Sequence, residues 1–260
     1  MSQVQVRRGE AHIALLIDAD NSPAAKIEVI LTELSTYGVT NVRRAYGNWK
    51  KNELKGWEEK LHEHAIRPMQ QFDYSKGKNA SDMAMVIDAL ELLYTDRPDA
   101  FGIVSSDADF TPLVMHLRAK GAAVYGFGAQ KTPEPFVNAC SRFLYLDKLV
   151  ASVPTDVEGA GDDAIPVVPL RVPTGQLKQD AKLVGLLRSA IHAAADESGW
   201  ARVGSVGQQI GNQASFDSRN YGYATLTKLL AATQLFDLAH EGTSQVSVRD
   251  KRFAKSAKSG

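Results

Sequence analysis

The stretch IALLIDADNSP, residues 13–23, decides the fold of this chain. Five apolar residues end abruptly in the polar group DADN, and Ser22-Pro23 follows at once. A short apolar run of this kind predicts a buried strand, and Ser-Pro predicts a helix with Ser22 as its N-cap and Pro23 as its first residue. A solvent loop could hold the polar group, but so could the mouth of a parallel sheet, where ligands tend to bind.

Strand-like and helix-like segments alternate from this stretch to about residue 150. The strand-like segments are 13–17, 42–46, 65–70, 100–105, 123–127 and 143–146, and helical patterns cover 24–36, 53–64, 81–94, 110–120 and a shorter piece near Phe136. This βαβ rhythm predicts an α/β fold, in which helices cover both faces of a parallel sheet through right-handed crossovers. The ligand crevice of such a sheet lies at the carboxyl ends of its strands.

A second predicted strand ends in the same way as the first. The run AFGIVSSDADF, residues 100–110, leads into Asp107 and Asp109, so two acidic pairs are expected at one crevice. In KGKNASDMAMVIDALELL, Asn79 fits the N-cap of the predicted helix, which places Asp82 in the first helical turn. If that helix begins beside the strand ends, the carboxylates converge.

Carboxylates gathered in one crevice repel one another unless protons or cations neutralise them. Hard divalent ions such as Mg²⁺ and Mn²⁺ prefer oxygen ligands and commonly combine a few carboxylates with substrate phosphate, so the pattern predicts phosphodiester hydrolysis. Structural roles stay open for two acids, because Asp109 could N-cap a helix and Asp82 could simply favour a helix dipole. Asp20 is expected to face solvent in the turn and ranks below Asp18 and Asn21.

Three motifs follow one another in a recognisable order: IDADN, NASDMAMVIDAL and IVSSDADFTPLVMHLRAKGAAVYGFG. Over about residues 11–150 this order resembles the NYN domain, a branch of the PIN-like ribonucleases. The resemblance implies a PIN-like, Rossmann-like parallel sheet and a metal-dependent ribonuclease. By matching motif positions, it also implies that Asp18, Asp82 and Asp107 are metal ligands, that Asn21 organises the site, and that Asp109 is a further ligand or a water-positioning acid.

Basic groups near the predicted crevice could hold an RNA strand. Lys76 and Lys78 precede the acidic helix and could reach phosphates, with a solvated loop as the alternative. Arg43 and Arg44 belong to a basic segment that also contains an aromatic side chain, Trp49. Such a segment could contact phosphates through its basic groups and stack a base on its aromatic ring. A structural role is favoured for this segment, because loops that start helices are often basic and Trp49 can pack inward.

A linker is predicted at residues 151–175, which are rich in Pro, Gly and acids and show no helical or strand period. The charge differs on its two sides. Residues 1–150 hold 18 Lys and Arg against 19 Asp and Glu, whereas residues 175–260 hold 11 against 7. The excess of +4 in the C-terminal part suits contact with a polyanion, although it does not establish nucleic-acid binding alone.

Residues 176–250 follow a second plan. One amphipathic helix is predicted for LKQDAKLVGLLRSAIHAAAD, residues 177–196, and further helical pieces and a hairpin around HEGTS indicate a winged-helix-like domain. The motifs SVGQQIGNQ and FDSRNYGYATLTKLLAATQLFDL resemble the LOTUS domain, also called OST-HTH. That resemblance implies binding of RNA, including structured or G-rich RNA, and sometimes of protein partners. The candidate RNA contacts are Arg219, Tyr221 and Lys228, whereas Tyr223 is expected in the core.

Composition narrows the class of protein. The chain is 44% hydrophobic and 23% charged, and it has neither an apolar run long enough to span a membrane nor the apolar core of a signal peptide. A soluble, cytoplasmic protein without a membrane partner is therefore expected. Cys140 is the single cysteine, which excludes a disulfide framework within one chain and predicts a small buried hydrophobe. The tail, residues 251–260, is predicted to be disordered, and its lysines to attract phosphate weakly.

Two functions of different classes follow. The first is a ribonuclease dependent on Mg²⁺ or Mn²⁺, whose C-terminal domain captures RNA and whose linker presents it at a raised effective concentration. The second is an RNA-binding regulator whose crevice holds a metal but does not cut. A phosphatase or nucleotide hydrolase ranks last, because the chain lacks a phosphate-cradling motif such as Walker A. The sequence leaves homo-oligomerisation open.

Overall fold

The computed structural model describes residues 10–72, 79–149 and 171–256, with side chains described up to residue 253. Lys76, Lys78 and most of the predicted linker lie outside the described residues. The chain divides into two compact units, Met1–Asp147 and Lys148–Gly260, and each is considered by itself. Within the described residues, none of the helices combines the length and apolar character needed to cross a membrane.

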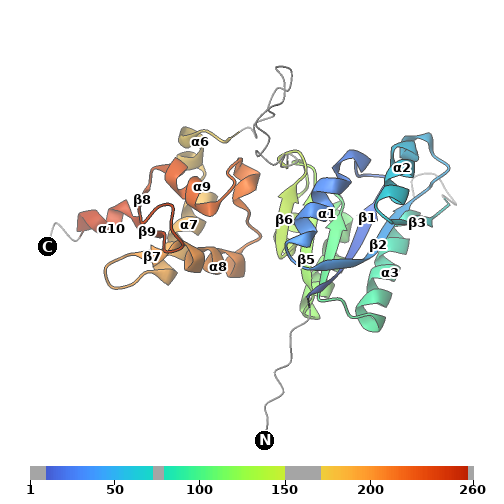
Figure 1. Ribbon diagram of the computed structural model, residues 1–260, viewed down its shortest axis with the longest axis horizontal. Coiled ribbons are helices and arrows are strands. Elements are labelled where there is room, and N and C mark those ends of the chain that lie inside the picture. Colours follow the sequence, from blue (N-terminus) through green and yellow to red (C-terminus); the bar gives the residue numbers. More distant parts are fainter. Residues whose placement is uncertain (1–9, 73–78, 150–170, 257–260) are drawn as a thin grey trace, which may run out of the picture. The chain divides into compact units, whose positions relative to one another are not determined.

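The first unit is built on a six-stranded sheet in which every neighbouring pair of strands is parallel (Figure 1). The strands are β1 (His12–Asp18), β2 (Val39–Gly47), β3 (Arg67–Gln70), β4 (Ala100–Val104), β5 (Ala123–Gly128) and β6 (Arg142–Tyr145). Their order is β3-β2-β1-β4-β5-β6, so the chain runs outward from β1 to β3 and then crosses back to β4. This reversal leaves a crevice at the carboxyl ends of β1 and β4. The predicted α/β class with a parallel sheet is confirmed.

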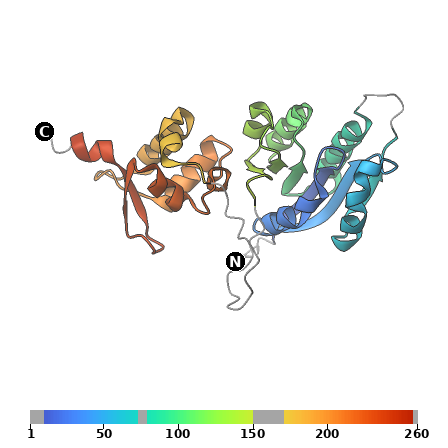
Figure 2. The ribbon, with the colours of Figure 1, turned by 90° about the horizontal axis from the view of Figure 1, so that it is seen from above.

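Helices cover both faces of this sheet (Figure 2). Helices α1 (Ile27–Ser35) and α2 (Lys55–Glu63) lie on one face, and α3 (Ala80–Thr95), α4 (Thr111–Ala119) and α5 (Glu134–Ala139) lie on the other. Single 3-10 turns, η1 (Ala24–Lys26), η2 (Asn52–Leu54) and η3 (Ala108–Phe110), precede α1, α2 and α4. A core cluster that includes Met85, Leu92, Phe101, Phe110 and Phe143 joins α3, α4 and α5 to the sheet, and Cys140 is buried in it as predicted.

Strand β1 carries the apolar run to the edge of the crevice. All of β1 except its first residue is buried, because β2 and β4 pair with its two edges and helices cover its faces. Leu16 joins the cluster of α3, α4 and α5, while Leu15 meets Leu34 of α1 over Gly102. A Cβ on Gly102 would lie 3.0 Å from Leu34 Cδ1, so a larger residue here would require the leucine side chain to shift by a few tenths of an ångström. Burial of each such leucine contributes about 1.5–3 kcal/mol and holds Asp18 in place at the strand end.

The helix behind β1 begins later than predicted. Pro23 rather than Ser22 occupies the N-cap position, one 3-10 turn follows, and α1 starts at Ile27. The Ser22 hydroxyl instead donates to the carbonyl oxygen of Val104, at the end of β4, over 3.3 Å. Ser22 therefore ties the β1–α1 loop to the neighbouring strand, and this tertiary contact competes with the local capping role.

The second unit combines helices with a small antiparallel sheet of order β7-β9-β8. Its helices are α6 (Thr174–Gln179), α7 (Ala181–Ala194), α8 (Val203–Gln213), η4 (Ser218–Tyr221), α9 (Leu226–Thr233) and α10 (Lys251–Ser256), and its strands are β7 (Ala201–Arg202), β8 (Phe236–Ala239) and β9 (Ser247–Asp250). Helices followed by the β8–β9 hairpin give the predicted winged-helix-like plan. Strand β7 is an additional short strand that the sequence patterns do not reveal.

The first helices of this unit differ from the prediction. The single helix predicted for 177–196 is broken at Asp180, whose carboxylate accepts a hydrogen bond from the Leu183 amide at 2.9 Å and so caps α7. An aspartate can lie within a helix, but it is also a favourable N-cap. Here Asp180 acts as the N-cap, so one helix ends and another begins at this residue.

Both ends of the second unit extend beyond the predicted boundaries. The Val172 amide donates to the Tyr221 carbonyl at 3.0 Å, and the Val172 carbonyl accepts from the hydroxyl of Tyr223 at 2.8 Å, which lies in the core as predicted. The unit thus begins inside the predicted linker. At the other end, α10 forms where a disordered tail is predicted. The Phe253 ring covers Gly199 so closely that a Cβ there would lie 2.5 Å from it, which explains the added order.

Candidate metal centre

Asp18 lies at the base of the acidic site, with 1% of its surface exposed. Its carboxylate accepts hydrogen bonds from Asn21 Nδ2 at 3.0 and 3.3 Å and from Ser105 Oγ at 2.9 Å. Asn21 belongs to the turn after β1, and Ser105 directly follows β4. The Ser105 contact depends on the register that pairs Ile17 with Val104, whereas the Asn21 contact is made within the turn, so the sheet and the turn together orient the Asp18 carboxylate.

Asp107 and Asp109 lie in the loop after β4. Asp107 is the N-cap of η3, because its Oδ1 accepts from the Asp109 amide at 2.9 Å, and its own amide donates to Ser105 Oγ at 3.1 Å. The Asp109 carboxylate accepts from Asn79 Nδ2 at 3.5 Å, at the start of α3. The alternative in which Asp109 is the N-cap of the following helix is wrong, since Asp107 is the N-cap of η3 and Phe110 is the N-cap of α4.

Helix α3 brings the third acid to the crevice. Asn79 occupies its N-cap position and Asp82 lies in its first turn, as predicted. The Asn79 side chain, however, bonds to Asp109 and makes no capping hydrogen bond to its own helix. Asp82 is half-buried at the positive end of the helix dipole, which favours its negative charge.

The pKa of Asp82 is raised by its surroundings. Burial is the largest cause, and the carboxylates of Asp18, Asp107, Asp20 and Asp109 add to it in that order, so that together they raise the pKa of Asp82 to about 6. Burial also raises the pKa of Asp18, against the opposing effect of the hydrogen bonds that it accepts. The five acids therefore act as one electrostatic group, and a bound cation would relieve their repulsion.

The prediction that Asp20 faces solvent is wrong. Its side chain is 17% exposed, accepts a hydrogen bond from Ser81 Oγ at 3.0 Å, and pairs with Lys51 Nζ at 3.4 Å. Asp20 thus joins the β1–α1 loop to the start of α3 and to the segment before η2. The second carboxylate of IDADN was the available signal, but a sequence cannot show which side chain of a turn points inward.

The donor set of this site fits a hard divalent cation, since carboxylate oxygens are the ligands that Mg²⁺ and Mn²⁺ prefer. Part of the rise in the pKa of Asp82 comes from the neighbouring carboxylates, and a bound cation would offset that part. Across the described part of the chain, no three of these acids bring their oxygens within 4.8 Å of one another. The carboxylates would therefore have to rotate inward to share one ion.

Another set of side chains does meet that distance: Glu28, Glu63 and His64. Lys60 Nζ lies 2.8 Å from a carboxylate oxygen of each glutamate. Because this ammonium already neutralises the pair, the set is an exposed ion-pair network, which contributes little to stability. This set includes none of the crevice acids, and we do not assign it a metal site.

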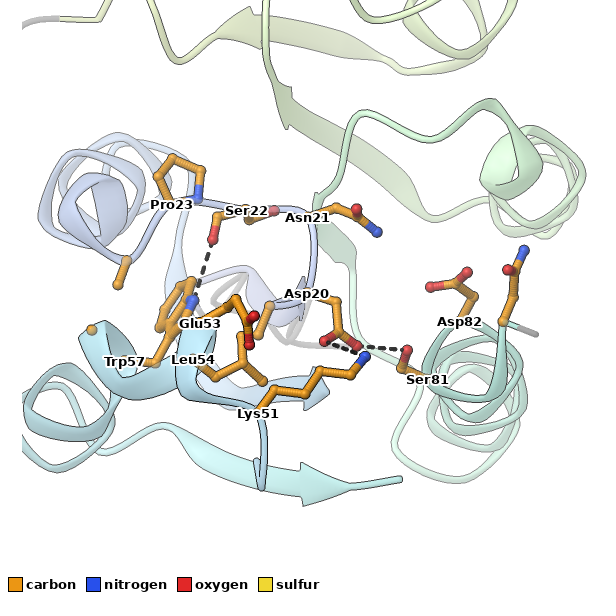
Figure 3. A pocket seen from close by; sticks show the side chains of 14 residues that line it. Asp20, Asn21, Ser22, Pro23, Lys51, Glu53, Leu54, Trp57, Ser81 and Asp82 are labelled. Atoms are coloured by element: carbon orange, nitrogen blue, oxygen red, sulfur yellow. Dashed lines mark hydrogen bonds and ion pairs between the residues drawn. The ribbon is translucent and has the colours of Figure 1, made fainter. Parts of the chain in front are cut away.

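A pocket of about 570 Å³ opens beside the acidic group (Figure 3). Asp20, Asn21 and Asp82 form part of its lining, so the pocket and the acidic group are continuous. Lys51 and Trp57 line the part that η2 and α2 contribute. The sequence patterns predicted the crevice but not this side pocket.

The predicted basic residues of β2 have structural partners. Arg44 pairs with the buried carboxylate of Asp88 on α3, which also accepts a hydrogen bond from the Tyr46 hydroxyl. Arg43 Nη1 donates to the carbonyl oxygen of His64, at the C-cap of α2, over 2.8 Å. Arg43 and Arg44 therefore hold helices against opposite faces of β2 and are not brought to the acidic group, in agreement with the favoured structural role.

The candidate RNA contacts of the second unit lie in different environments. The Arg219 guanidinium makes a two-point ion pair with Asp217, through Nε at 2.9 Å and Nη2 at 2.7 Å. Tyr221 is half-buried, with its ring centroid 6.0 Å from that of Phe216. Lys228 is exposed in the first turn of α9. Of these residues Lys228 is the most accessible to a ligand, whereas the guanidinium of Arg219 is already engaged by Asp217.

Acidification should stabilise the metal-free protein through Asp82. The folded-state pKa is about 6 and the ordinary value is 3.8, so the native state binds more protons between these values, and the free energy of unfolding falls as the pH rises through this window. Solvent screening of a half-buried group reduces the effect to about 1–2 kcal/mol. Urea unfolding in EDTA at pH 5 and pH 7 measures it.

The control for this measurement is Asp82→Asn, which should flatten the difference in unfolding free energy between the two pH values. An Asp82→Asn variant that keeps the full wild-type difference would show that other groups cause it.

Comparison with known proteins gives matches to both units. The model of the NYN domain matches residues 12–147, and the model of the OST-HTH/LOTUS domain matches residues 177–248. An uncharacterized protein of Methanocaldococcus jannaschii is 31% identical over 128 residues, which are 48% of this chain and 50% of that protein. The chain thus spans about half the length of the curated relative that it matches. A solved protein of unknown function from Vibrio parahaemolyticus has 19% identity and a TM-score of 0.44, covering 55% of this chain and 96% of its own.

Proposed function

Since the chain belongs to the NYN domain family and carries a C-terminal OST-HTH/LOTUS domain, we propose that it is a metal-dependent ribonuclease that hydrolyses RNA phosphodiester bonds. NYN domains are PIN-like nuclease domains and LOTUS domains bind RNA, so both units point to RNA as the partner. The observation that carries the proposal is the convergence of Asp18, Asp82 and Asp107, from β1, α3 and the loop after β4, on one electrostatic group.

Each acid has a distinct task in the proposed reaction. Asp18, Asp82 and Asp107 would hold Mg²⁺ or Mn²⁺, which, when bound, activates water and stabilises the charge that develops on the phosphate. Asn21 and Ser105 keep the Asp18 carboxylate in one orientation through hydrogen bonds of 3.0 and 2.9 Å.

Asp109 is exposed at the rim of the site, where it can complete the ligand set or orient the attacking water. Its hydrogen bond to Asn79, at 3.5 Å, is long and easily exchanged for one to substrate or solvent. This contact leaves Asp109 the most adaptable of the acids.

The second unit supplies RNA capture in this proposal. Its net charge of +4 over residues 175–260 attracts phosphate, and its covalent link to the first unit raises the effective concentration of bound RNA at the acidic site. The pairing suits a nuclease whose own crevice is acidic and therefore repels RNA until cations are bound.

The alternative function is an RNA-binding regulator that does not cut. The spacing of the acids favours it, because in the described residues no three of their oxygens lie close enough to share an ion without rotation. The distinguishing property is turnover, since both functions include RNA binding.

Turnover should require a divalent ion and Asp107. Labelled single-stranded and structured RNA are incubated with the full chain in Mg²⁺, Mn²⁺ or EDTA, beside the Asp107→Asn variant. An amide keeps the oxygen that caps η3 and loses the charge, so cleavage should fall about a hundredfold to a thousandfold while the fold survives.

Cleavage that persists in EDTA, or that is undiminished in Asp107→Asn, would contradict the metal mechanism. Tight RNA binding without turnover in any of the three conditions would instead support the regulator.

A further inference from the structure

The pocket beside the acidic group is lined in part by residues that the proposed metal chemistry does not use. Its volume of about 570 Å³ lies within the range of about 300–1,000 Å³ that is typical of small-molecule sites. Asp20 and Asp82 belong to both the pocket and the acidic group, while Glu53 and Trp57 line the part formed by η2 and α2 (Figure 3). Gly56 of α2 also lines this part. A ligand in the pocket would therefore lie directly beside the acids.

We propose that this pocket is a nucleobase subsite, which takes one base of single-stranded RNA next to the scissile phosphate and prefers bases that carry an amino group. This inference rests on the proposed ribonuclease function. It adds that the pocket binds a base of the RNA substrate.

The wall of the pocket is packed before any ligand binds. Trp57 is 2% exposed, and its Nε1 donates to the carbonyl oxygen of Ser22 at 3.2 Å, which fixes α2 against the β1–α1 loop. Leu54 is 5% exposed and lies so close to Gly47 that a Cβ there would be 2.8 Å from Leu54 Cδ1. A preformed wall lowers the ordering cost of binding, as a specific subsite requires.

The charge of the lining favours a base over a phosphate. Three carboxylates line the pocket, from Asp20, Glu53 and Asp82, against the single ammonium that the described lining residues supply, that of Lys51. This ammonium lies 3.4 Å from Asp20 and is already paired with it. A phosphate would be repelled, whereas the N–H groups of a base would meet acceptors.

Glu53 is the residue that can distinguish one base from another. Its carboxylate has no hydrogen bond or ion pair with the described residues, and in Figure 3 it extends into the space between Lys51 and Ser22. An ionised carboxylate only accepts hydrogen bonds, so it pairs with the amino groups of adenine, cytosine or guanine. Uracil carries carbonyl oxygens in place of an amino group and offers only its N3–H as a donor, so it would be disfavoured.

Gly56 allows the pocket to be blocked without touching an acid. It lines the pocket, and a Cβ built on it meets nothing within 4 Å, so a side chain can be added at the pocket wall without a clash at Cβ. In the full chain, Gly56→Phe should raise the KM for single-stranded RNA about tenfold, with a smaller change in kcat. Gly56→Ala should leave KM near wild type, because it adds one methyl group and favours helix.

Gly185→Phe is the matched control for an added aromatic side chain. Gly185 lies in α7 of the second unit, and a Cβ there also meets nothing within 4 Å. This variant should leave kcat and the base preference unchanged, because both are assigned to the first unit.

The base preference is tested with Glu53→Gln, which keeps the size of the side chain and adds a donor. Wild type should cleave A and C contexts on the order of tenfold faster than U contexts, as one good base contact allows, and Glu53→Gln should reduce this ratio to about threefold or less. Calorimetry of AMP, CMP and UMP binding to the full chain measures the same base preference without requiring cleavage.

The outcomes separate this inference from the proposed function. Cleavage with unchanged KM in Gly56→Phe and an unchanged base ratio in Glu53→Gln would overturn the subsite and leave the ribonuclease intact. Preferential binding of AMP and CMP that is lost in Glu53→Gln would support the subsite even if no RNA is cut. Equal binding of all three nucleotides by wild type, without cleavage, would overturn both.

Discussion

Asp18→Asn should lower RNA turnover by about a thousandfold at saturating Mg²⁺, the largest effect expected from a single substitution in this chain. The carboxylate ends β1 at the base of the site, and the amide that replaces it keeps the shape but loses the negative charge that would hold the ion. Loss of about 4 kcal/mol of transition-state stabilisation corresponds to this factor. Single-turnover cleavage of labelled RNA measures it.

The fold should survive this substitution. Burial raises the pKa of Asp18, which means that the ionised carboxylate costs stability at neutral pH. The neutral amide removes that cost and can still accept from Asn21 or Ser105 through its remaining oxygen. The melting temperature of the metal-free variant should therefore equal or exceed that of wild type at pH 7.

Asp99→Asn provides a matched control on the same sheet. Asp99 precedes β4, at the amino ends of the strands, and its Oδ2 accepts from the His12 amide at 2.8 Å. An asparagine keeps this acceptor, so turnover should stay near the wild-type value. A comparable loss in Asp99→Asn and Asp18→Asn would show that the effect is structural and not tied to the acidic site.

Separation of the two units should separate RNA binding from cutting. A fragment ending at Thr155 keeps the complete NYN match and should retain kcat within about threefold, while its KM rises about tenfold to a hundredfold through lost effective concentration. A fragment of residues 171–260 should bind RNA without cutting. It begins at residue 171 because Val172 is hydrogen-bonded to Tyr221 and Tyr223 and belongs to the second unit.

Salt dependence identifies the source of the binding energy. The affinity of the 171–260 fragment should fall steeply between 50 and 200 mM salt, because several phosphates are neutralised. For single-stranded RNA, each phosphate contact should lower the slope of log affinity against log salt concentration by about 0.7. Fluorescence anisotropy at the two concentrations measures this slope. If the fragment has no affinity for RNA even at low salt, its helices serve a protein partner instead, and RNA capture by the second unit should be abandoned.

The alternation of short apolar runs with helical periods was sufficient to predict the parallel sheet and its helical layers. Local patterns predict such elements because each buried strand or amphipathic helix must show its own period. The placement of Asp18 after a buried strand and of Asp82 in the first turn of a helix also follows from neighbours in sequence. Convergence of these acids then follows from the rule that parallel strands end at one edge.

Features that depend on distant partners were decided only by the tertiary structure. Ser22 bonds across to β4 instead of capping its helix, Asp20 turns inward toward Ser81, and Arg44 pairs with Asp88 on α3. In each case a polar side chain has both a local role and a partner from another segment. Once the sheet excludes water, the partner within hydrogen-bonding distance prevails, because a buried polar group without one costs about 1–3 kcal/mol. That distance exists only in the folded chain.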